Sequence, residues 1–292
     1  MSRDPRDGFR GDPDRQQPER RREATPDDYD LERAPPRRRQ PPSGGGGGGA
    51  LKVIFIVLGV VLLVTLLCGG GLVGLMFYSV GKVRNAATRI TAQNNMKQMG
   101  LAMHNLNDSQ GHLVASLPAK DGKPGLSWRV AILPYIEQEN LYRQFKLDEP
   151  WDSPNNIKLL DQMPYVYRNP RLPHPLNQTG YRIFVGNGAM FEHGKKTLLN
   201  VGGKKAPDEI QVGDGLSNTI MIVEGTDSVP WTKPDEFVFQ PNGALPSFGP
   251  TGDPVFMVLL ADGSTKAIPV GTLANLIKDA ITANGGEKTI LP

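Results

Sequence analysis

Acidic side chains are the residues whose types and spacing come closest to a chemical site in this sequence. Asp208, Glu209, Asp214, Glu224 and Asp227 fall in loops or at the ends of predicted strands. Oxygen-rich loops can hold Ca²⁺, which makes Asp214, Glu224 and Asp227 weak candidates for calcium ligands. Their spacing fits no defined calcium-binding loop, however, and solvated acids in turns show the same pattern. We therefore predict no metal site.

Motifs for other chemistries are missing from the sequence. The four histidines, His104, His112, His174 and His193, have no metal-ligand spacing, and the single cysteine lies far from them in the chain. The sequence contains no Gly-x-Ser-x-Gly elbow, no Walker loop and no His-Glu-x-x-His motif. We therefore predict a non-enzymatic protein with no catalytic residue and no cofactor.

Aromatic residues and charge restrict the partners that we expect. Trp128 and Trp231, with Tyr135 and Tyr142, are candidates for an aromatic patch that meets a glycan or a protein, although burial is the commoner position of a tryptophan. Residues 81–292 carry 21 basic and 20 acidic side chains. A nucleic-acid-binding domain concentrates basic charge on one surface, so the sequence favours no nucleic-acid partner.

A long apolar run divides the chain in two. No side chain in residues 53–81 is charged, and most of these residues are Val, Leu, Ile, Phe or Gly. Because a helix needs about 20 apolar residues to cross a hydrocarbon core, we predict a single-pass transmembrane helix over residues 51–80. The run is longer than the core of a signal peptide and follows a polar arm. We therefore expect a retained signal-anchor in the cytoplasmic (inner) membrane, with membrane lipid as a partner.

Orientation and helix association are predicted from the residues in and around this run. The compact triplet Arg37, Arg38 and Arg39 favours a cytoplasmic N-terminus and an extracytoplasmic C-terminal domain, although the basic charges flanking the run tie. Gly70 and Gly74 form a G-x-x-x-G spacing that would let two helices self-associate closely, and a kink at these glycines is the alternative.

The arm that precedes the apolar run, residues 1–50, is rich in proline, arginine and glycine. It contains too few apolar residues to offset the entropy of ordering, so we predict a disordered region. A solvated tether is the favoured interpretation. A docking tail or a contact with anionic lipid through the arginine triplet are the alternatives.

Beyond the run, helical periodicity gives way to short strands. Met96, Met99, Met103 and Leu106 recur at steps of three and four, which predicts an amphipathic helix with these residues as its core seam. Strands are expected over residues 181–185, 219–224, 255–261 and 265–268, the last two joined by an Asp-Gly turn, and a final helix over residues 272–283. The fold class that follows is α+β. One transmembrane helix continues into a long amphipathic helix packed on an antiparallel sheet, and the extracytoplasmic domain covers residues 81–292.

Several segments together resemble one family. They read QNNMKQMGLAMHNLNDSQG at residues 93–111, SWRVAILPYIEQENLYRQF at 127–145 and LLADGSTKAI at 259–268, with further matches at 150–156, 214–225 and 229–236. In this order and spacing they resemble a pilin-like domain of unknown function that is expanded in planctomycete bacteria and usually follows a prepilin-type leader. The resemblance covers nearly all of residues 83–290 and implies a pilin-like fold.

The sequence departs from that family's pattern in three places. The apolar run has no glutamate of the kind that serves in filament assembly, Gly252 stands where members commonly have histidine, and the common Cys-Pro-Ser segment is missing. These departures imply a tethered variant whose anchor is not cleaved.

The function that we expect is that of a membrane-anchored, non-enzymatic, pilin-like structural or interaction protein of the cell envelope or of a secretion-type assembly. A tethered receptor for a solute or carbohydrate is the alternative, and an envelope hydrolase comes third. A pocket with converging polar groups would favour the receptor, whereas a helix seam without a pocket would favour the structural protein.

Overall fold

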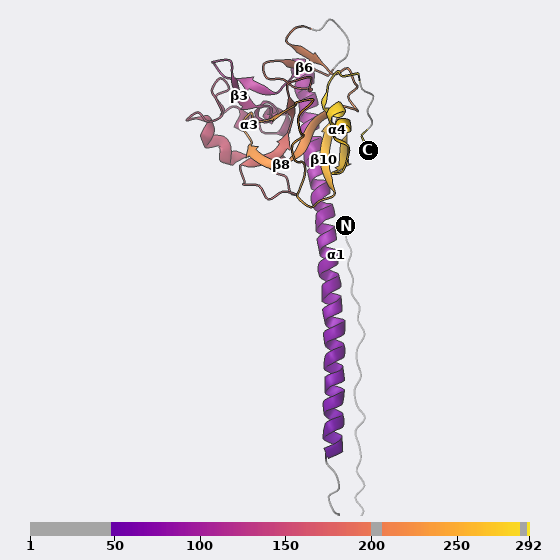
Figure 1. The fold of residues 1–292 in the computed structure, drawn as a ribbon. Coiled ribbons are helices and arrows are strands. Elements are labelled where there is room, and N and C mark those ends of the chain that lie inside the picture. The colour runs from indigo at the N-terminus through magenta and orange to yellow at the C-terminus, as the bar shows by residue number, and fades with distance from the viewer. Residues whose placement is uncertain (1–47, 200–205, 287–290) are drawn as a thin grey trace, which may run out of the picture. The chain divides into compact units, whose positions relative to one another are not determined.

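The computed structural model describes residues 48–199, 206–286 and 291–292, and for residues 48, 50 and 67–82 it describes the backbone alone. Most of the arm predicted to be disordered over residues 1–50 therefore lies outside the described residues. The chain divides into two units, Met1–Val64 and Thr65–Pro292, which are described separately. Figure 1 traces the elements along the chain, from α1 in indigo to α4 in yellow.

Helix α1 (Gly48–Gln110) is 63 residues long and takes in both the apolar run and the predicted seam. No proline occurs within it to interrupt its backbone hydrogen bonds. The helix ends where Gly111 adopts a left-handed conformation, with φ of 79°. The Gly111 N–H donates to the Asn107 carbonyl at 2.6 Å, an arrangement that glycine provides at many helix ends because it has no Cβ.

The prediction of a transmembrane helix over residues 51–80 is wrong. Among the residues that the structure describes, no helix is both long enough and apolar enough to cross a membrane. Within the predicted span, the structure describes the side chains of residues 51–66, which include the charged Lys52, whereas a span needs about 20 apolar residues. The corresponding expectations of a single-pass signal-anchor, of the cytoplasmic membrane as location, and of a cytoplasmic N-terminus with an extracytoplasmic C-terminal domain are corrected with it.

In the first unit, the described part of α1 is apolar and open to solvent. Every side chain that is described between residues 51 and 64 is exposed. The large apolar ones among them are between 50% and 68% exposed, with Phe55 the most exposed. Such a surface on a described helix has no counterpart in the second unit, whose apolar side chains mostly enter a core.

The second unit is an α+β domain with short helices and several small sheets. Its first half holds α2 (Trp128–Ala131), η1 (Leu133–Ile136), α3 (Glu139–Tyr142), η2 (Asn156–Gln162) and η3 (Tyr165–Tyr167), and the last helix is α4 (Ala274–Ile281). The strands are β1 (Leu113–Val114), β2 (Ser116–Pro118), β3 (Pro124–Ser127), β4 (Gln178–Arg182), β5 (Phe184–Val185), β6 (Lys196–Leu198), β7 (Glu209–Gln211), β8 (Ile220–Pro230), β9 (Phe237–Val238), β10 (Val255–Leu260) and β11 (Thr265–Pro269).

The largest sheet is antiparallel, with the strand order β11-β10-β8-β4. The predicted hairpin is confirmed, because β10 pairs with β11 so that Leu259 faces Thr265 across the turn. Three smaller sheets accompany it: β1-β6-β7, β2-β3 and β5-β9. The pairs β6–β7 and β5–β9 are parallel, a feature that the sequence did not predict.

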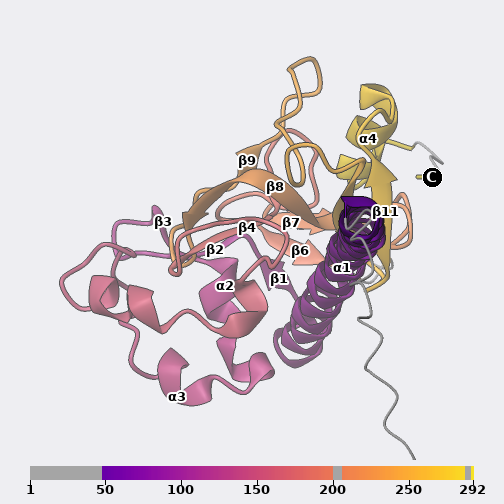
Figure 2. The same cartoon turned by 90° about the horizontal axis from the view of Figure 1, so that it is seen from below.

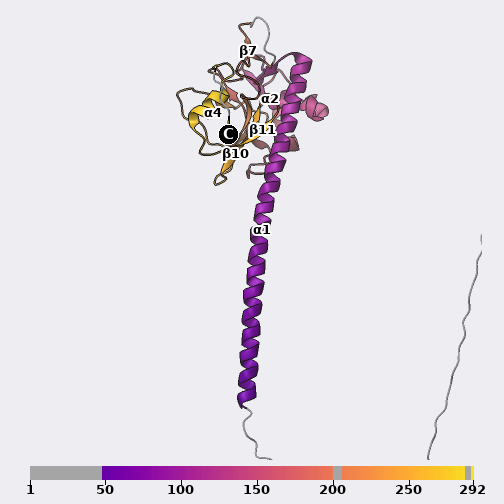
Figure 3. The same cartoon turned by 90° about the vertical axis from the view of Figure 1, so that its right-hand side faces the viewer.

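The side chains of the central sheet alternate between two core clusters. On β10, Met257 and Leu259 join the cluster that contains the α1 seam. Phe256, Val258 and Leu260 instead join the cluster with α4. Figures 2 and 3 show the same arrangement, with α4 and the C-terminal part of α1 on opposite sides of β10 and β11. Successive side chains of a strand point to opposite faces of the sheet. The sheet therefore lies between α1 on one face and α4 on the other.

Candidate functional site

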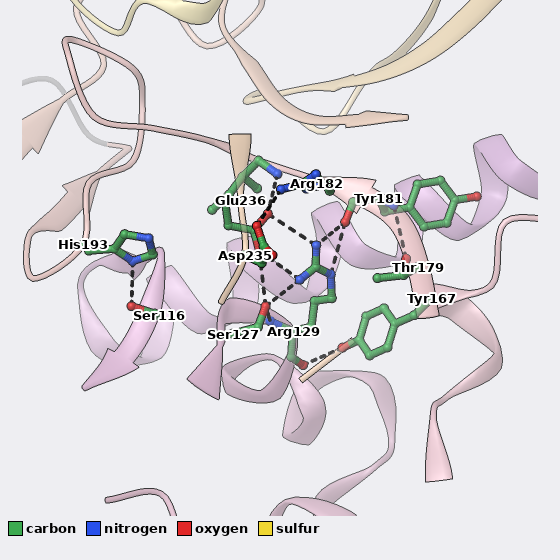
Figure 4. Close-up of polar contacts among 11 residues, drawn as sticks. Ser116, Ser127, Arg129, Tyr167, Thr179, Tyr181, Arg182, His193, Asp235 and Glu236 are labelled. Carbon is green, nitrogen blue, oxygen red and sulfur yellow. Dashed lines mark hydrogen bonds and ion pairs between the residues drawn. The ribbon is translucent and has the colours of Figure 1, made fainter. Parts of the chain in front are cut away.

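A fully buried ion pair forms the polar centre of the second unit. The Nη1 and Nη2 atoms of Arg129 lie 2.8 and 3.3 Å from the two carboxylate oxygens of Glu236, and both side chains are 0% exposed. Arg129 also donates to Ser127 Oγ and to the Tyr181 carbonyl, and Glu236 accepts the Ile183 N–H at 3.0 Å. Figure 4 shows Arg129 between these partners.

Local structure explains how the arginine reaches this position. Ser127 caps α2, its hydroxyl accepting the Arg129 N–H at 3.3 Å. This cap places Arg129 in the first turn of a helix whose four residues are all buried. The Tyr167 hydroxyl then donates to the Arg129 carbonyl at 2.7 Å. The ion pair therefore joins α2, η3, β4 and the segment before β9, which are far apart in the sequence.

The electrostatics of the Arg129–Glu236 pair favour a structural role over acid–base catalysis. Burial raises the pKa of Glu236, and the Arg129 guanidinium opposes that rise. A charge taken out of water is costly unless it is paired and hydrogen-bonded, and here each charged atom of the carboxylate has such a partner. Because the polar atoms of both side chains already have partners, the pair holds the surrounding segments in place.

A second set of charges connects the pair to the surface. Arg182 Nη2 and Lys233 Nζ lie 3.1 and 2.8 Å from the two oxygens of Asp235. Burial alone would raise the pKa of Asp235, but its lysine and arginine neighbours bring that pKa below the usual value. The Arg182 guanidinium also lies 3.9 Å from the centre of the Phe237 ring. Together with Arg129 and Glu236, these groups comprise three cations and two carboxylates.

An open cavity of about 440 Å³ borders this charged cluster. Its polar lining includes His193, Lys233 and Asp235, and its aromatic lining is Trp151. His193 Nδ1 lies 2.8 Å from Ser116 Oγ, as Figure 4 shows. Burial lowers the pKa of His193, so near neutral pH its imidazole is an uncharged hydrogen-bonding group.

The acids considered as calcium ligands lie apart and have other partners. Glu224 is fully buried and accepts hydrogen bonds from Asn169 and from the Met257 N–H, with Arg171 as its ion-pair partner. Asp214 accepts the N–H groups of Gly285 and Gly286, at 2.7 and 2.8 Å. Asp227 is exposed. Across the described parts of the chain, no group of three or more His, Cys, Asp or Glu side chains is placed to hold a metal ion.

The other candidate residues are placed as follows. Met96, Met99, Met103 and Leu106 are at most 2% exposed and lie in the core. The surroundings of Gly70 and Gly74 fall outside the described side chains, so their role in helix association stays a prediction.

The tryptophans of the expected aromatic patch are buried. Trp128 and Trp231 are 1% and 0% exposed, and the Trp231 ring packs on Phe145 and Tyr167. The residues that the sequence analysis missed are Arg129, Glu236 and Trp151. Arg129 had a signal, since a charged residue within the apolar run of residues 128–136 needs a partner if it is buried.

Fold and site together define an α+β protein whose charged centre ties its segments to one another. A family model described as "Protein of unknown function (DUF1559)" matches residues 81–255. The chain belongs to this family, which confirms the expected relationship to a domain of unknown function. A search of the curated proteins and a search of the solved structures gave no match.

Proposed function

We propose that this chain is a pilin-like, non-enzymatic structural protein of the kind expanded in planctomycete bacteria, and that it assembles with copies of itself through the apolar part of α1. The exposed apolar surface of α1 over residues 51–66 carries the proposal. Leu51 and Leu66, at the two ends of this surface, are 58% and 65% exposed, and Phe55 between them is 68% exposed. A monomeric protein rarely exposes so many adjoining apolar side chains.

Copies of the same segment suit this surface because of its composition. Residues 53–66 contain no charged side chain, so two such helices meet without repulsion and without burying a charge. Their apolar residues occupy every side of the helix, whereas a helix that packs on one neighbour is apolar on one side only. A bundle of three or more copies covers more of this surface than a dimer does.

The charged centre also supports a structural role. Arg129 and Glu236 are saturated by internal partners and are 0% exposed. A catalytic acid or base must reach a substrate proton, directly or through one water. A pair in this environment instead stabilises the folded domain that each copy carries.

Sedimentation of the full chain tests the proposal. We expect the wild-type protein to sediment as a species of three or more copies, and the triple variant Phe55→Gln, Leu58→Gln, Leu66→Gln to sediment as a monomer. The control variant Ile90→Gln, Leu101→Gln removes exposed apolar side chains from a later part of α1, outside residues 51–66, and should leave the oligomer intact. A monomeric wild-type protein, or one that binds lipid vesicles without self-association, would overturn the proposal.

A further inference from the structure

We propose that the cavity beside Trp151 binds a saccharide that carries a carboxylate, such as a uronic acid unit. This site is separate from the apolar part of α1 and does not depend on the assembly proposed above. Its lining comes from β3, β5 and β9 and from the segments after α3, after β5 and between β8 and β9.

Trp151 supplies an apolar face for the sugar ring. Trp151 is half-buried: it packs in part against the core and also lines the cavity. The backbone N–H of Trp151 donates to the Gly125 carbonyl at 2.8 Å, which ties the backbone of this residue to β3. Its aromatic ring offers a large contact area, and a tryptophan side chain has few torsion angles whose freedom is lost on binding. Pro124 and Pro234 extend the apolar lining.

The charges around the cavity select an acidic ligand. Asp235 is shared between Arg182 and Lys233, and Glu236 is occupied by Arg129. Asp227 also acts electrostatically on Arg182, so three cations face three carboxylates, but Lys233 has to share Asp235 with Arg182. Lys233 is the accessible cation of this cluster, with a side chain 38% exposed and Nζ 5.9 Å from the centre of the Trp151 ring. A ligand carboxylate beside the tryptophan would give Lys233 a counter-ion that it does not share.

Polar groups on the cavity wall suit sugar hydroxyls. His193 is held at Nδ1 by Ser116, and among the described residues its Nε2 has no hydrogen-bond partner. A fixed, uncharged imidazole can accept from or donate to a hydroxyl. Aromatic contact, one ammonium and a few fixed polar groups are the components from which small-molecule sites are built.

Calorimetry of the full chain with tri-galacturonate as the probe tests this site. We expect binding that weakens at least tenfold in Lys233→Gln and again when salt is raised from 0.05 to 0.5 M. Maltotriose, a neutral trisaccharide, should bind at least tenfold more weakly than tri-galacturonate. The matched control Lys158→Gln removes an exposed lysine that lies outside the cavity and should leave the affinity unchanged.

The aromatic contact is tested separately. Trp151→Phe should retain part of the affinity and Trp151→Ala should lose it, with circular dichroism used to check that each variant is folded. If Trp151→Ala fails to fold, the Lys233→Gln result and the comparison of the two trisaccharides decide the question. Absence of tri-galacturonate binding at millimolar concentration, equal binding of maltotriose, or an affinity that Lys233→Gln does not change would each overturn the proposal. Sedimentation of the same samples reports on assembly independently.

Discussion

The pairing of Arg129 with Glu236 shows how burial changes the importance of an ion pair. The Glu139–Arg143 pair has a similar distance, 2.6 Å, but its side chains are 59% and 72% exposed. Water and ions screen an exposed pair, so it adds little to stability. Removing one member of a buried pair instead leaves a charge without compensation.

We therefore expect Glu236→Leu to lower the free energy of unfolding by about 3–5 kcal/mol, because Arg129 would remain buried without its counter-ion. Urea denaturation measures the change. In Glu139→Leu the same substitution at an exposed site should have little or no effect. Adding Arg129→Met to Glu236→Leu should recover part of the loss, since the double variant no longer buries an isolated charge. A small effect of Glu236→Leu alone would contradict the structural role of the pair.

Among the elements, α1 differs most from one end to the other. In the second unit its seam enters the core, and Gly100 allows a close approach to β10. A Cβ at this position would lie 3.0 Å from Leu259 Cδ2, although glycine within a helix costs about 1 kcal/mol relative to alanine. Close packing between helix and sheet thus accounts for a residue that helix propensity disfavours.

The seam of α1 makes a prediction at the scale of this element. Met103 is 1% exposed, whereas Leu101, two residues earlier, is 62% exposed. Met103→Ala should lower the free energy of unfolding by about 2–5 kcal/mol, because it removes buried apolar atoms and leaves a cavity. Leu101→Ala should change it by no more than about 0.5 kcal/mol. Equal effects of the two substitutions in thermal or urea denaturation would contradict the assignment of the buried face.

For the whole molecule, the positions of core residues indicate which part of the chain can fold alone. Among the described side chains, the first buried apolar one is Ala92, and the family match begins at residue 81. Five core residues of α1, namely Met96, Met99, Ala102, Met103 and Leu106, join the larger cluster. Each large apolar side chain contributes about 1.5–3 kcal/mol on burial. Their sum is comparable to the whole stability of a typical domain, about 5–15 kcal/mol.

A fragment of residues 81–292 should therefore fold and melt cooperatively, with a near-ultraviolet circular dichroism spectrum that shows fixed tryptophan environments. A fragment of residues 112–292, which lacks α1, should show no cooperative transition. If the shorter fragment melted like the longer one, the seam would not be part of the core. Failure of the longer fragment to fold would instead show that residues before 81 are needed.

Local patterns in the sequence were sufficient for several elements. The methionine spacing indicated the buried face of α1, and Asp262-Gly263 marked the β10–β11 turn, where Gly263 has φ of 82°. The last helix was expected over residues 272–283 and is observed as Ala274–Ile281. Each of these features depends on residues a few positions apart, whose propensities act on the same turn or strand.

Only the tertiary structure shows the features that depend on residues far apart in the sequence. Arg129 and Glu236 are 107 positions apart, and the parallel pairs β5–β9 and β6–β7 join segments with no shared local pattern. For the apolar run the sequence-based prediction was wrong. Its hydropathy indicated a membrane span, but no described helix provides one. Periodicity reports which side of an element is apolar, but the partner of a buried charge, and what covers an apolar side, are set by segments that only folding or assembly brings together.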